Sequence, residues 1–448
     1  MIKRFSVLAM IIVFSTTMAI LSGWAYLYGS SSGKILPGIT CAGVTLGGLS
    51  PDMAEEALKE KYRSLDKESL TLEGSGQQWK IKMSDLGAVY GYREAVRKAY
   101  AIGRSGPVPR QVTDLMRNRE QSTIVQLPII FDQEALKKKL ERIHRDYSLF
   151  PKNARLIINE QSNEVKPIAA VIGREMDLAE TTRRILSLKA GNTKVAIASR
   201  SLLPFVRDED VAGLTQVLGK AVTYFEEETS ARLSNMTKAV NRLDGSIIKP
   251  GETFSFTQRI SPMNEKGGYQ KAPVIVSDQL VFDYGGGVCQ VSTTLYEAVL
   301  LSGIDIVERH ANSKPVQYSS PGMEAIVSEG QWDLKFRNNL GQPVYISVSV
   351  NLEEGSITIN LIGSKSKDKT IKMESEVTSI PQEITIIKNP SMEPDFSSVM
   401  EEGSPGFDAM IYRTTLNGEK VEKRELISHD HYNPDPTVIE EGPSTAAE

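Results

Sequence analysis

The feature that most constrains the fold of this chain is a run of three glycines, Gly285-Gly286-Gly287, directly before an apolar segment. Glycine adopts backbone geometries that a Cβ forbids and lets neighbouring groups approach closely. From residue 291 to residue 301, apolar side chains recur at helical spacing, and Gly303 then supplies a stop. Cys289 is therefore predicted to lie in the first turn of a helix with a buried face, behind a loop without side-chain bulk.

That position favours the ionised form of the Cys289 thiol, because unpaired N–H groups and the positive end of the helix dipole stabilise a thiolate. A thiolate there can attack an acyl group, with nearby backbone amides as donors to the oxyanion. Gly286, Gly287, Gln290 and Ser292 are the predicted substrate-binding residues around it. The alternative is that Cys289 packs the start of the helix as a small apolar residue, since many free cysteines are buried and unreactive.

The composition excludes several classes of protein. The chain has 448 residues, of which 40% are hydrophobic and 24% charged, so it is predicted to form about three globular domains. A net charge of −4 gives no reason to expect a nucleic-acid partner. The two cysteines, Cys41 and Cys289, are compatible with one disulfide at most. With only four histidines besides, we expect neither a metal nor another cofactor.

The N-terminus is predicted to anchor the chain in a membrane. Lys3 and Arg4 precede a nearly continuous apolar run from residue 5 to residue 28, which suits a span of about 20 residues. The basic pair places the N-terminus in the cytoplasm and the remaining chain outside it. We therefore expect residues 1–29 to be the single-pass anchor of a monomeric extracytoplasmic protein at the cell membrane. The alternative is cleavage near Gly23-Trp24-Ala25, which would release a secreted protein.

The following region is predicted to be a duplicated α+β module, with repeats at residues 34–125 and 126–213. Each repeat contains a helix, a hairpin, a glycine and a second helix. The predicted helices are at 53–62, 92–102, 133–146 and 178–188, and the predicted strands at 70–74, 79–83, 154–158 and 165–170. Pro107-Val108-Pro109 is predicted to end a unit.

The repeats contain short motifs centred on glycine. They are Gly43-Val44-Thr45-Leu46-Gly47-Gly48-Leu49-Ser50, Asp85-Leu86-Gly87, Ala99-Tyr100-Ala101-Ile102-Gly103-Arg104-Ser105-Gly106 and Gly173-Arg174-Glu175-Met176-Asp177. These motifs resemble those of the YoaR-like peptidoglycan-binding domain over most of the two repeats. The resemblance implies peptidoglycan as a partner. Since neither repeat contains an evident catalytic group of residues, a structural spacer is the alternative to a binding module.

Residues 214–367 carry a second series of motifs. In order, they are Arg232-Leu233-Ser234-Asn235, Lys249-Pro250-Gly251-Glu252-Thr253-Phe254-Ser255-Phe256, Gly268-Tyr269, Gly285-Gly286-Gly287-Val288-Cys289-Gln290-Val291-Ser292-Thr293-Thr294-Leu295-Tyr296, Glu308-Arg309, Ser313 and Asp333-Leu334-Lys335-Phe336-Arg337-Asn338-Asn339. This series resembles the VanW family over about a third of the chain. The family is linked to glycopeptide resistance and to cell-wall proteins, so the resemblance implies a protein of the cell wall.

Residues 378–442 are predicted to form a small β-rich domain. Asn417-Gly418 is a hairpin signal between two strand-like segments. Glycines and prolines recur in Glu402-Gly403-Ser404-Pro405-Gly406-Phe407-Asp408. Their placement is similar to that in the small extracellular domains named for five glycines, which accompany cell-wall enzymes and adhesins.

His310 is the candidate base for Cys289, because it is the only histidine within residues 214–367. In the VanW family the usual histidine lies two residues later, where this chain has Asn312. Positions i and i+2 of a strand face the same way, so His310 is predicted to reach the same pocket. The alternative is a histidine exposed at the end of a strand.

Two acidic residues are candidates for orienting that imidazole. The usual Gly-x-Asp-Ala-Thr-Val of the family appears here as Gly322-Met323-Glu324-Ala325-Ile326-Val327, so Glu324 keeps the charge on a longer stem. Asp333, in the motif that follows, is the second candidate. The alternative is that Asp333 is a solvated residue in a turn.

Three further residues are assigned to substrate binding. Arg309 is suited to a bidentate contact with a substrate carboxylate, or else to an ion pair with Glu308 or Asp305. Arg232 and Asn235 are placed in the same pocket, with the surface of a helix as the alternative location.

The predicted fold class is α+β and multidomain: two small repeats, a mixed α+β core and a small β-rich C-terminal domain. Two functions remain open. In the first, the chain is a cysteine acyltransferase of the L,D-transpeptidase kind that acts on peptidoglycan peptides through a Cys289 thioester. In the second, it is a non-catalytic peptidoglycan-binding scaffold, or an accessory protein of glycopeptide resistance, and Cys289 is a packing residue.

Overall fold

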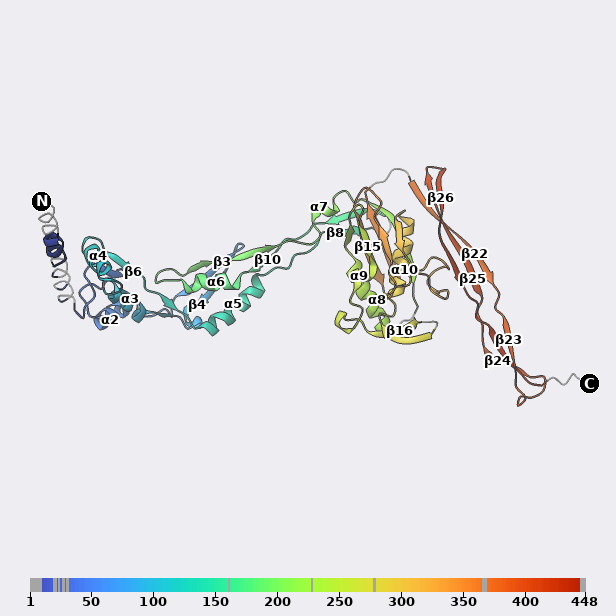
Figure 1. The fold of residues 1–448 in the computed structure, drawn as a ribbon, viewed down its shortest axis with the longest axis horizontal. Coiled ribbons are helices and arrows are strands. Elements are labelled where there is room, and N and C mark those ends of the chain that lie inside the picture. The colour runs from blue at the N-terminus through green and yellow to red at the C-terminus, as the bar shows by residue number, and fades with distance from the viewer. Residues whose placement is uncertain are drawn as a thin grey trace, which may run out of the picture. The chain divides into compact units, whose positions relative to one another are not determined.

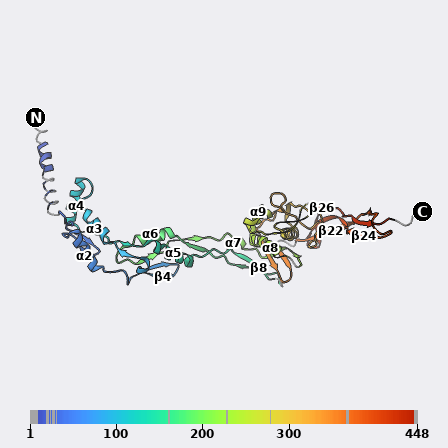
Figure 2. The ribbon, with the colours of Figure 1, turned by 90° about the horizontal axis from the view of Figure 1, so that it is seen from below.

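A computed structural model describes residues 10–18, 22, 25, 29, 32–159, 162–226, 229–276, 279–364 and 369–443. The chain divides into two compact units. Unit 1 comprises Met1–Pro151 and Ile172–Leu203, and unit 2 comprises Lys152–Val171 and Pro204–Glu448. Both units combine helices with many small sheets, so the predicted α+β multidomain fold class is confirmed (Figure 1, Figure 2).

The predicted anchor, residues 1–29, lies largely outside the described residues. Its described residues 10–18 are helical and carry exposed apolar side chains. In the part of the chain that the structure describes, no helix combines the length and the apolar character needed to cross a membrane.

Unit 1 contains short helices packed on small sheets. Its helices are α2 (Pro51–Lys61), η1 (Met83–Leu86), α3 (Tyr92–Ala101), α4 (Val108–Glu120), α5 (Gln133–Tyr147) and α6 (Leu178–Leu186). Its strands are β1 (Ile39–Cys41), β2 (Val44–Thr45), β3 (Ser69–Gly74), β4 (Gln77–Lys82), β5 (Val89–Tyr90), β6 (Thr123–Val125), β7 (Ile129–Ile130), β10 (Gly173–Met176), β11 (Lys194–Ala196) and β12 (Ser199–Leu202). The sheet orders are β2-β1-β6, β11-β3-β4, β10-β12 and β5-β7.

The two predicted repeats are interleaved. Strand β11, from the second repeat, runs parallel to β3 from the first, and β7 from the second repeat pairs antiparallel with β5 from the first. Buried apolar residues of both repeats, from Ile35 to Ile197, form one core. The hairpin of the second repeat, β8 (Arg155–Ile158) and β9 (Val165–Ile168), belongs to unit 2. The repeated elements therefore exist, but they do not form two separate cores.

Local signals explain how two helices of unit 1 begin. Ser50 caps α2, since its hydroxyl accepts a hydrogen bond from the Met53 amide at 3.3 Å and Pro51 occupies the first helical position. Pro107-Val108-Pro109, predicted to end a unit, instead opens α4. A proline is tolerated in the first turn because its missing N–H group would have no partner within the helix.

Unit 2 has a central sheet with the order β13-β21-β20-β14. Its helices are α7 (Asp208–Val211), α8 (Ser230–Leu243), α9 (Phe256–Ile260), η2 (Glu265–Gly267) and α10 (Val288–Leu301). The strands that accompany them, besides β8 and β9, are β13 (Gln216–Tyr224), β14 (Ser246–Ile248), β15 (Thr253–Ser255), β16 (Lys271–Val276), β17 (Gln279–Tyr284), β18 (Asp305–Glu308), β19 (Lys335–Arg337), β20 (Val344–Asn351) and β21 (Ser356–Gly363).

Helix α10 packs against β13 and β21, and α8 packs against α10 and β20. The apolar positions Val291, Leu295 and Val299 are fully buried in this core, as the helical spacing predicts. Helix α10 ends at Leu301, and Gly303 follows with a φ of +74°, so the predicted stop is confirmed. Strand β13 lies so close beneath the helix that a Cβ at Gly219 would be 2.3 Å from the Ala298 carbonyl oxygen.

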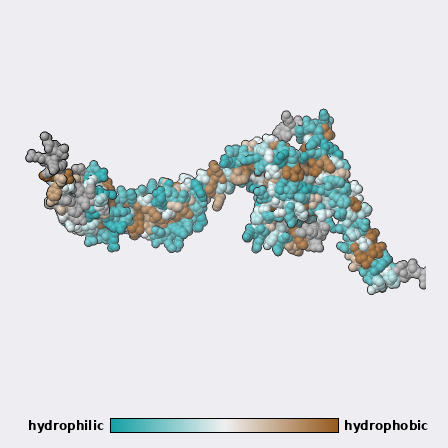
Figure 3. All heavy atoms as spheres, in the orientation of Figure 1, coloured by the Kyte–Doolittle hydropathy of each residue, from teal (hydrophilic) through white to brown (hydrophobic). Residues whose placement is uncertain are grey.

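The C-terminal part of unit 2 consists of strands. They are β22 (Lys369–Ile380), β23 (Ile384–Lys388), β24 (Ser397–Glu401), β25 (Gly406–Asn417), β26 (Lys420–Tyr432) and β27 (Thr437–Glu441), in sheets of the order β22-β25-β26 and β23-β27-β24. The predicted hairpin joins β25 and β26, with Gly418 and Glu419 as its turn residues and a φ of +62° at Gly418. Figure 3 shows apolar surface over β23 and β24, where Ile384 and Val399 are exposed.

We predict that Gly219→Ala weakens the packing of α10 on β13. The added methyl group would meet the backbone of Ala298 and Ser302, which cannot rotate away, so the helix must shift. Overpacking of this kind costs about 1–3 kcal/mol. Hydrogen exchange of α10 amides should become faster. Gly341→Ala is the matched control, because a Cβ there meets open space; equal exchange in the two variants would contradict the prediction.

Candidate functional site

The glycine run forms a close backbone crossing, as predicted. Gly287 is the N-cap of α10 with a φ of +99°, and Gly285 has a φ of +88°. A Cβ at Gly286 would be 2.7 Å from the Pro273 carbonyl oxygen, and one at Gly287 would be 2.8 Å from the Arg232 side chain. These positions therefore require glycine. Cys289 follows in the first turn of α10.

Asn235 holds the glycine run in place. Its side-chain amide donates to the carbonyl oxygens of Gln270 at 2.9 Å and Gly286 at 3.1 Å, and its oxygen accepts from the Gln270 amide at 2.8 Å. The residue is fully buried within α8. The Asn235 side chain is therefore bonded to the backbone of the fold.

Cys289 is partly exposed, although Val288 and Gln290 on either side of it are buried. The thiol donates to the Val327 carbonyl oxygen at 3.6 Å. Burial raises the pKa of Cys289, and the backbone of Val327 and the charge of Arg232 lower it only in part. Tyr318 lies beside it: burial raises the pKa of Tyr318, and Cys289 raises it further. Burial is the largest influence on the thiol and favours its neutral form. Cys41 is also a free thiol, buried in unit 1.

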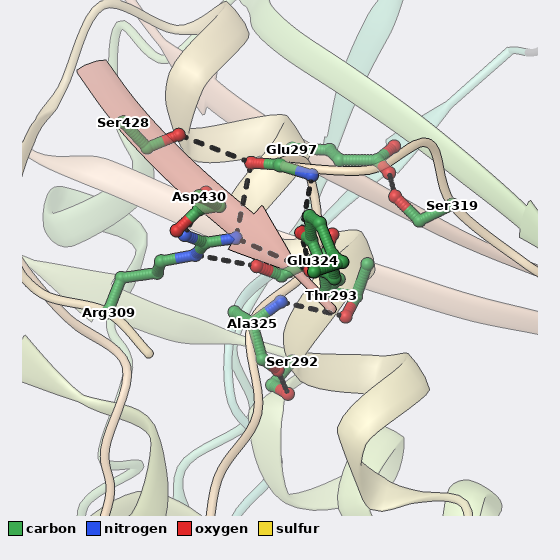
Figure 4. Close-up of polar contacts among 11 residues, drawn as sticks. Ser292, Thr293, Glu297, Arg309, Ser319, Glu324, Ala325, Ser428 and Asp430 are labelled. Atoms are coloured by element: carbon green, nitrogen blue, oxygen red, sulfur yellow. Dashed lines mark hydrogen bonds and ion pairs between the residues drawn. The ribbon is translucent and has the colours of Figure 1, made fainter. Parts of the chain in front are cut away.

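The segment that contacts the Cys289 thiol is the 309–334 loop, which connects β18 to β19. Polar side chains on the buried face of α10 hold it, as Figure 4 shows. Ser292 donates to the Ala325 carbonyl oxygen at 2.6 Å, and Thr293 accepts from the Ala325 amide at 3.1 Å. One turn further along, Glu297 accepts from the Ser319 hydroxyl at 2.7 Å. The loop therefore lies along the first three turns of the helix.

Glu324 is the centre of a buried ionic cluster in this loop. Its side chain is fully buried, one carboxylate oxygen accepts from the Tyr432 hydroxyl, and the other has no hydrogen-bond partner. The Arg309 guanidinium lies 3.7 Å from Glu324 and 2.6 Å from Asp430. Burial raises the pKa of Glu324. Burial also raises the pKa of the nearby Glu297, from its ordinary 4.5 to about 7.

The other predicted catalytic residues bond groups other than the thiol. The His310 imidazole is 3.2 Å from the Glu308 carboxylate and 6.2 Å, between ring centroids, from Trp332. Asp333 accepts from the Ser255 hydroxyl at 2.5 Å and the Thr257 amide at 2.9 Å, and so holds the start of α9. Among the described residues, no hydrogen bond joins Cys289 to His310, Glu324 or Asp333.

The remaining residues predicted to bind substrate are engaged within the fold. Gln290 donates to the Tyr224 carbonyl oxygen at 3.0 Å and accepts from Arg232 at 3.3 Å. Arg309 donates to the carbonyl oxygens of Glu324 at 2.7 Å and Gly322 at 3.2 Å. Arg309 thus pairs with acidic partners other than the Glu308 or Asp305 considered from the sequence.

Several residues of the site were not foreseen. Glu297 is the only charged side chain within α10, and that isolation in an apolar helix is a signal that sequence reasoning could have used. Tyr318 has no such signal. Asp430 and Tyr432 come from β26, more than a hundred positions after the residues they contact, and no local pattern indicates them.

Family models match three segments of the chain. Residues 231–362 match the model described as "VanW like protein". Residues 79–195 match "Putative peptidoglycan binding domain", a single match that spans both predicted repeats, and residues 371–444 match "G5 domain". The three resemblances stated from sequence motifs are therefore confirmed.

Two curated relatives are similar in sequence. The "Uncharacterized protein YoaR" of Bacillus subtilis is 36% identical over 196 residues, which is 43% of this chain and 64% of that protein. The "Vancomycin B-type resistance protein VanW" of Enterococcus faecalis is 30% identical over 143 residues, 31% of this chain and 50% of that protein. The match thus spans less than two thirds of the length of either relative.

Two solved structures have local similarity to the chain. The "IgA1 Protease G5 domain structure" is 23% identical, with a TM-score of 0.16, and covers 18% of this chain and 96% of that one. The "Crystal structure of HP0197-G5" is 20% identical, with a TM-score of 0.14, and covers 17% of this chain and 100% of that one.

We predict that Glu297→Gln removes part of the pH dependence of stability. Because burial raises the pKa of Glu297 to about 7, the folded state prefers the protonated carboxyl. The stability from this preference is complete below the ordinary pKa of 4.5 and is lost as the pH rises through about 7.

Relative to the wild type, Glu297→Gln should therefore gain free energy of unfolding as the pH rises across this window. The measurement is urea unfolding of both proteins at a series of pH values. Glu353→Gln, at an exposed turn, is the control and should show no such trend. A difference between Glu297→Gln and the wild type that does not change with pH would contradict the prediction.

Proposed function

We propose that this chain, a homologue of YoaR and VanW with peptidoglycan-binding, VanW-like and G5 domains, binds peptidoglycan in the cell wall and performs no chemistry. The observation that carries the second part is the Cys289 thiol, which donates to a backbone carbonyl and whose pKa is raised by burial. A cysteine nucleophile requires a thiolate and a base within reach. The described hydrogen-bond partner of the sulfur, the Val327 carbonyl, supplies neither.

The description of the segment at 79–195 supports peptidoglycan as the ligand of unit 1. The name of the second relative, a vancomycin B-type resistance protein, supports a role at the cell wall and an accessory function in glycopeptide resistance. Neither peptidoglycan binding nor an accessory role in glycopeptide resistance requires catalysis. Peptidoglycan binding is therefore the main activity that we propose.

We further propose that the chain is held at the cell membrane by its N-terminal segment, with its bulk on the extracytoplasmic side. The basic pair Lys3 and Arg4 before an apolar run supports this orientation. A protease added to intact protoplasts should then digest the chain down to a short membrane-associated remnant. Full protection until the membrane is lysed would contradict the proposal.

A second candidate function is acyl transfer by Cys289 after the 309–334 loop opens. The position of Cys289 in the first turn of α10, directly behind bare glycine backbone, favours it. In the reaction, the thiolate would attack a peptide carbonyl, the C–N bond would break with protonation of the leaving amine, and a thioester would form. Attack by an amine or water would then release the thiol.

One set of samples tests both functions. The full chain in mild detergent is mixed with insoluble peptidoglycan and centrifuged, and a parallel sample with soluble muropeptides is analysed by intact mass. We expect the wild type and Cys289→Ala to sediment equally with peptidoglycan, without an adduct. Failure to sediment would contradict wall binding. A covalent adduct that Cys289→Ala abolishes would establish acyl transfer and would overturn the claim that the protein performs no chemistry.

A further inference from the structure

The 309–334 loop is held from two sides. Its inner face is hydrogen-bonded to α10 through Ser292, Thr293 and Glu297, as described above. Its outer face contacts strands β25 and β26 of the C-terminal sheet. The inner contacts come from the segment that matches the VanW-like model, to which the loop itself belongs. The outer contacts come from the segment that matches the G5 domain.

Gly322 is the closest point of contact with the C-terminal sheet. Its amide donates to the Tyr432 hydroxyl at 2.8 Å, and its carbonyl oxygen accepts from Ser428 at 3.5 Å. Its φ is +86°, and a Cβ would be 2.8 Å from the Ile411 side chain. Ile411 and Tyr432 are fully buried. The loop therefore fits against the sheet as closely as a protein core, which a mobile surface segment would not do.

Charged groups fasten the same contact. Arg309 and Asp430, 2.6 Å apart, are only 7% and 14% exposed, and Lys314 forms an ion pair with Asp435. Arg309 also donates to two carbonyl oxygens of the loop, so it connects the loop backbone to β26. An ion pair this buried requires both partners, because removing one leaves a charge without compensation. Figure 4 shows Arg309, Asp430 and Glu324 together beside the α10 hydrogen bonds.

We propose that β26 acts as a latch that holds the 309–334 loop closed over Cys289, so that access to the thiol depends on whether the C-terminal sheet is seated. Tyr432 and Asp430 are the latch residues. Tyr432 bonds the Gly322 amide, and Asp430 pairs with Arg309. The loop opens when the latch is released, and Cys289 then exchanges the Val327 contact for water. Any ligand or pulling force that favours the unseated sheet raises the population of the open state.

This device is independent of whether the exposed thiol performs acyl transfer. It concerns only how the core and the C-terminal sheet of unit 2 control solvent access. A failure of peptidoglycan binding, or of the adduct experiment, would therefore leave it standing. Conversely, failure of the latch would leave the proposed wall-binding function intact.

The test is the rate at which a maleimide reagent labels Cys289 in the full chain with Cys41→Ala as background, which removes the second free thiol. We expect slow labelling in this background and roughly tenfold faster labelling after Tyr432→Phe, since one net hydrogen bond shifts an opening equilibrium by up to about that factor. Asp430→Asn should have at least as large an effect. Phenylalanine keeps the ring of Tyr432 and removes only the hydroxyl.

Arg424→Ala is the matched control. Arg424 lies on the same strand and pairs with Glu374 and Glu376 at 3.1 and 2.9 Å, away from the loop. It should leave the labelling rate unchanged. Hydrogen exchange is the second readout: the latch variants should accelerate exchange in the 309–334 loop and leave α8 unchanged.

Three outcomes would overturn the proposal. The first is labelling of the background protein at the rate of an exposed thiol. The second is an unchanged labelling rate in both Tyr432→Phe and Asp430→Asn. The third is faster exchange across α8 as well as the loop, because the strand would then support the whole fold of unit 2 and not the closure of the loop.

Discussion

The structure of unit 2 depends on the requirement that buried polar groups have hydrogen-bond partners. Helix α10 carries three consecutive hydroxyl side chains, Ser292, Thr293 and Thr294, that are fully buried. Each buried hydroxyl without a partner would cost about 1–3 kcal/mol. Thr294 meets Thr223 of β13 at 2.7 Å, and the other two bind the 309–334 loop. A helix with apolar residues at these positions would not need the loop at all.

The same requirement explains why the C-terminal sheet packs against the core. By lying on α10, the 309–334 loop buries Glu324 and Arg309, whose charges need partners in turn. Asp430 and Tyr432 of β26 provide them. Burial of a charge is unfavourable unless the charge is paired, so the buried charges of the loop require partners from a further segment of the chain. The core, the loop and the sheet are therefore energetically coupled.

This coupling decides the state of Cys289. The start of a helix stabilises a negative charge by about 0.3–1 kcal/mol at an exposed site and up to about 2 kcal/mol in a partly buried one. Desolvation of a fully enclosed group shifts a pKa by up to about 3–5 units, and one unit corresponds to about 1.4 kcal/mol. Burial is thus the larger effect, in agreement with the raised pKa of Cys289.

Local patterns in the sequence determined the local structure. The glycine run, the apolar spacing to residue 301, Gly303 and the Asn417-Gly418 turn each depend on neighbouring residues, and each was predictable for that reason. Motifs of consecutive residues likewise identified three families. Only the tertiary structure decided that the two repeats share one core, that His310 pairs with Glu308, and that Tyr432 contacts Glu324 across 108 positions. Burial and the choice of hydrogen-bond partner depend on which distant segments pack together, and no local pattern of side chains encodes that.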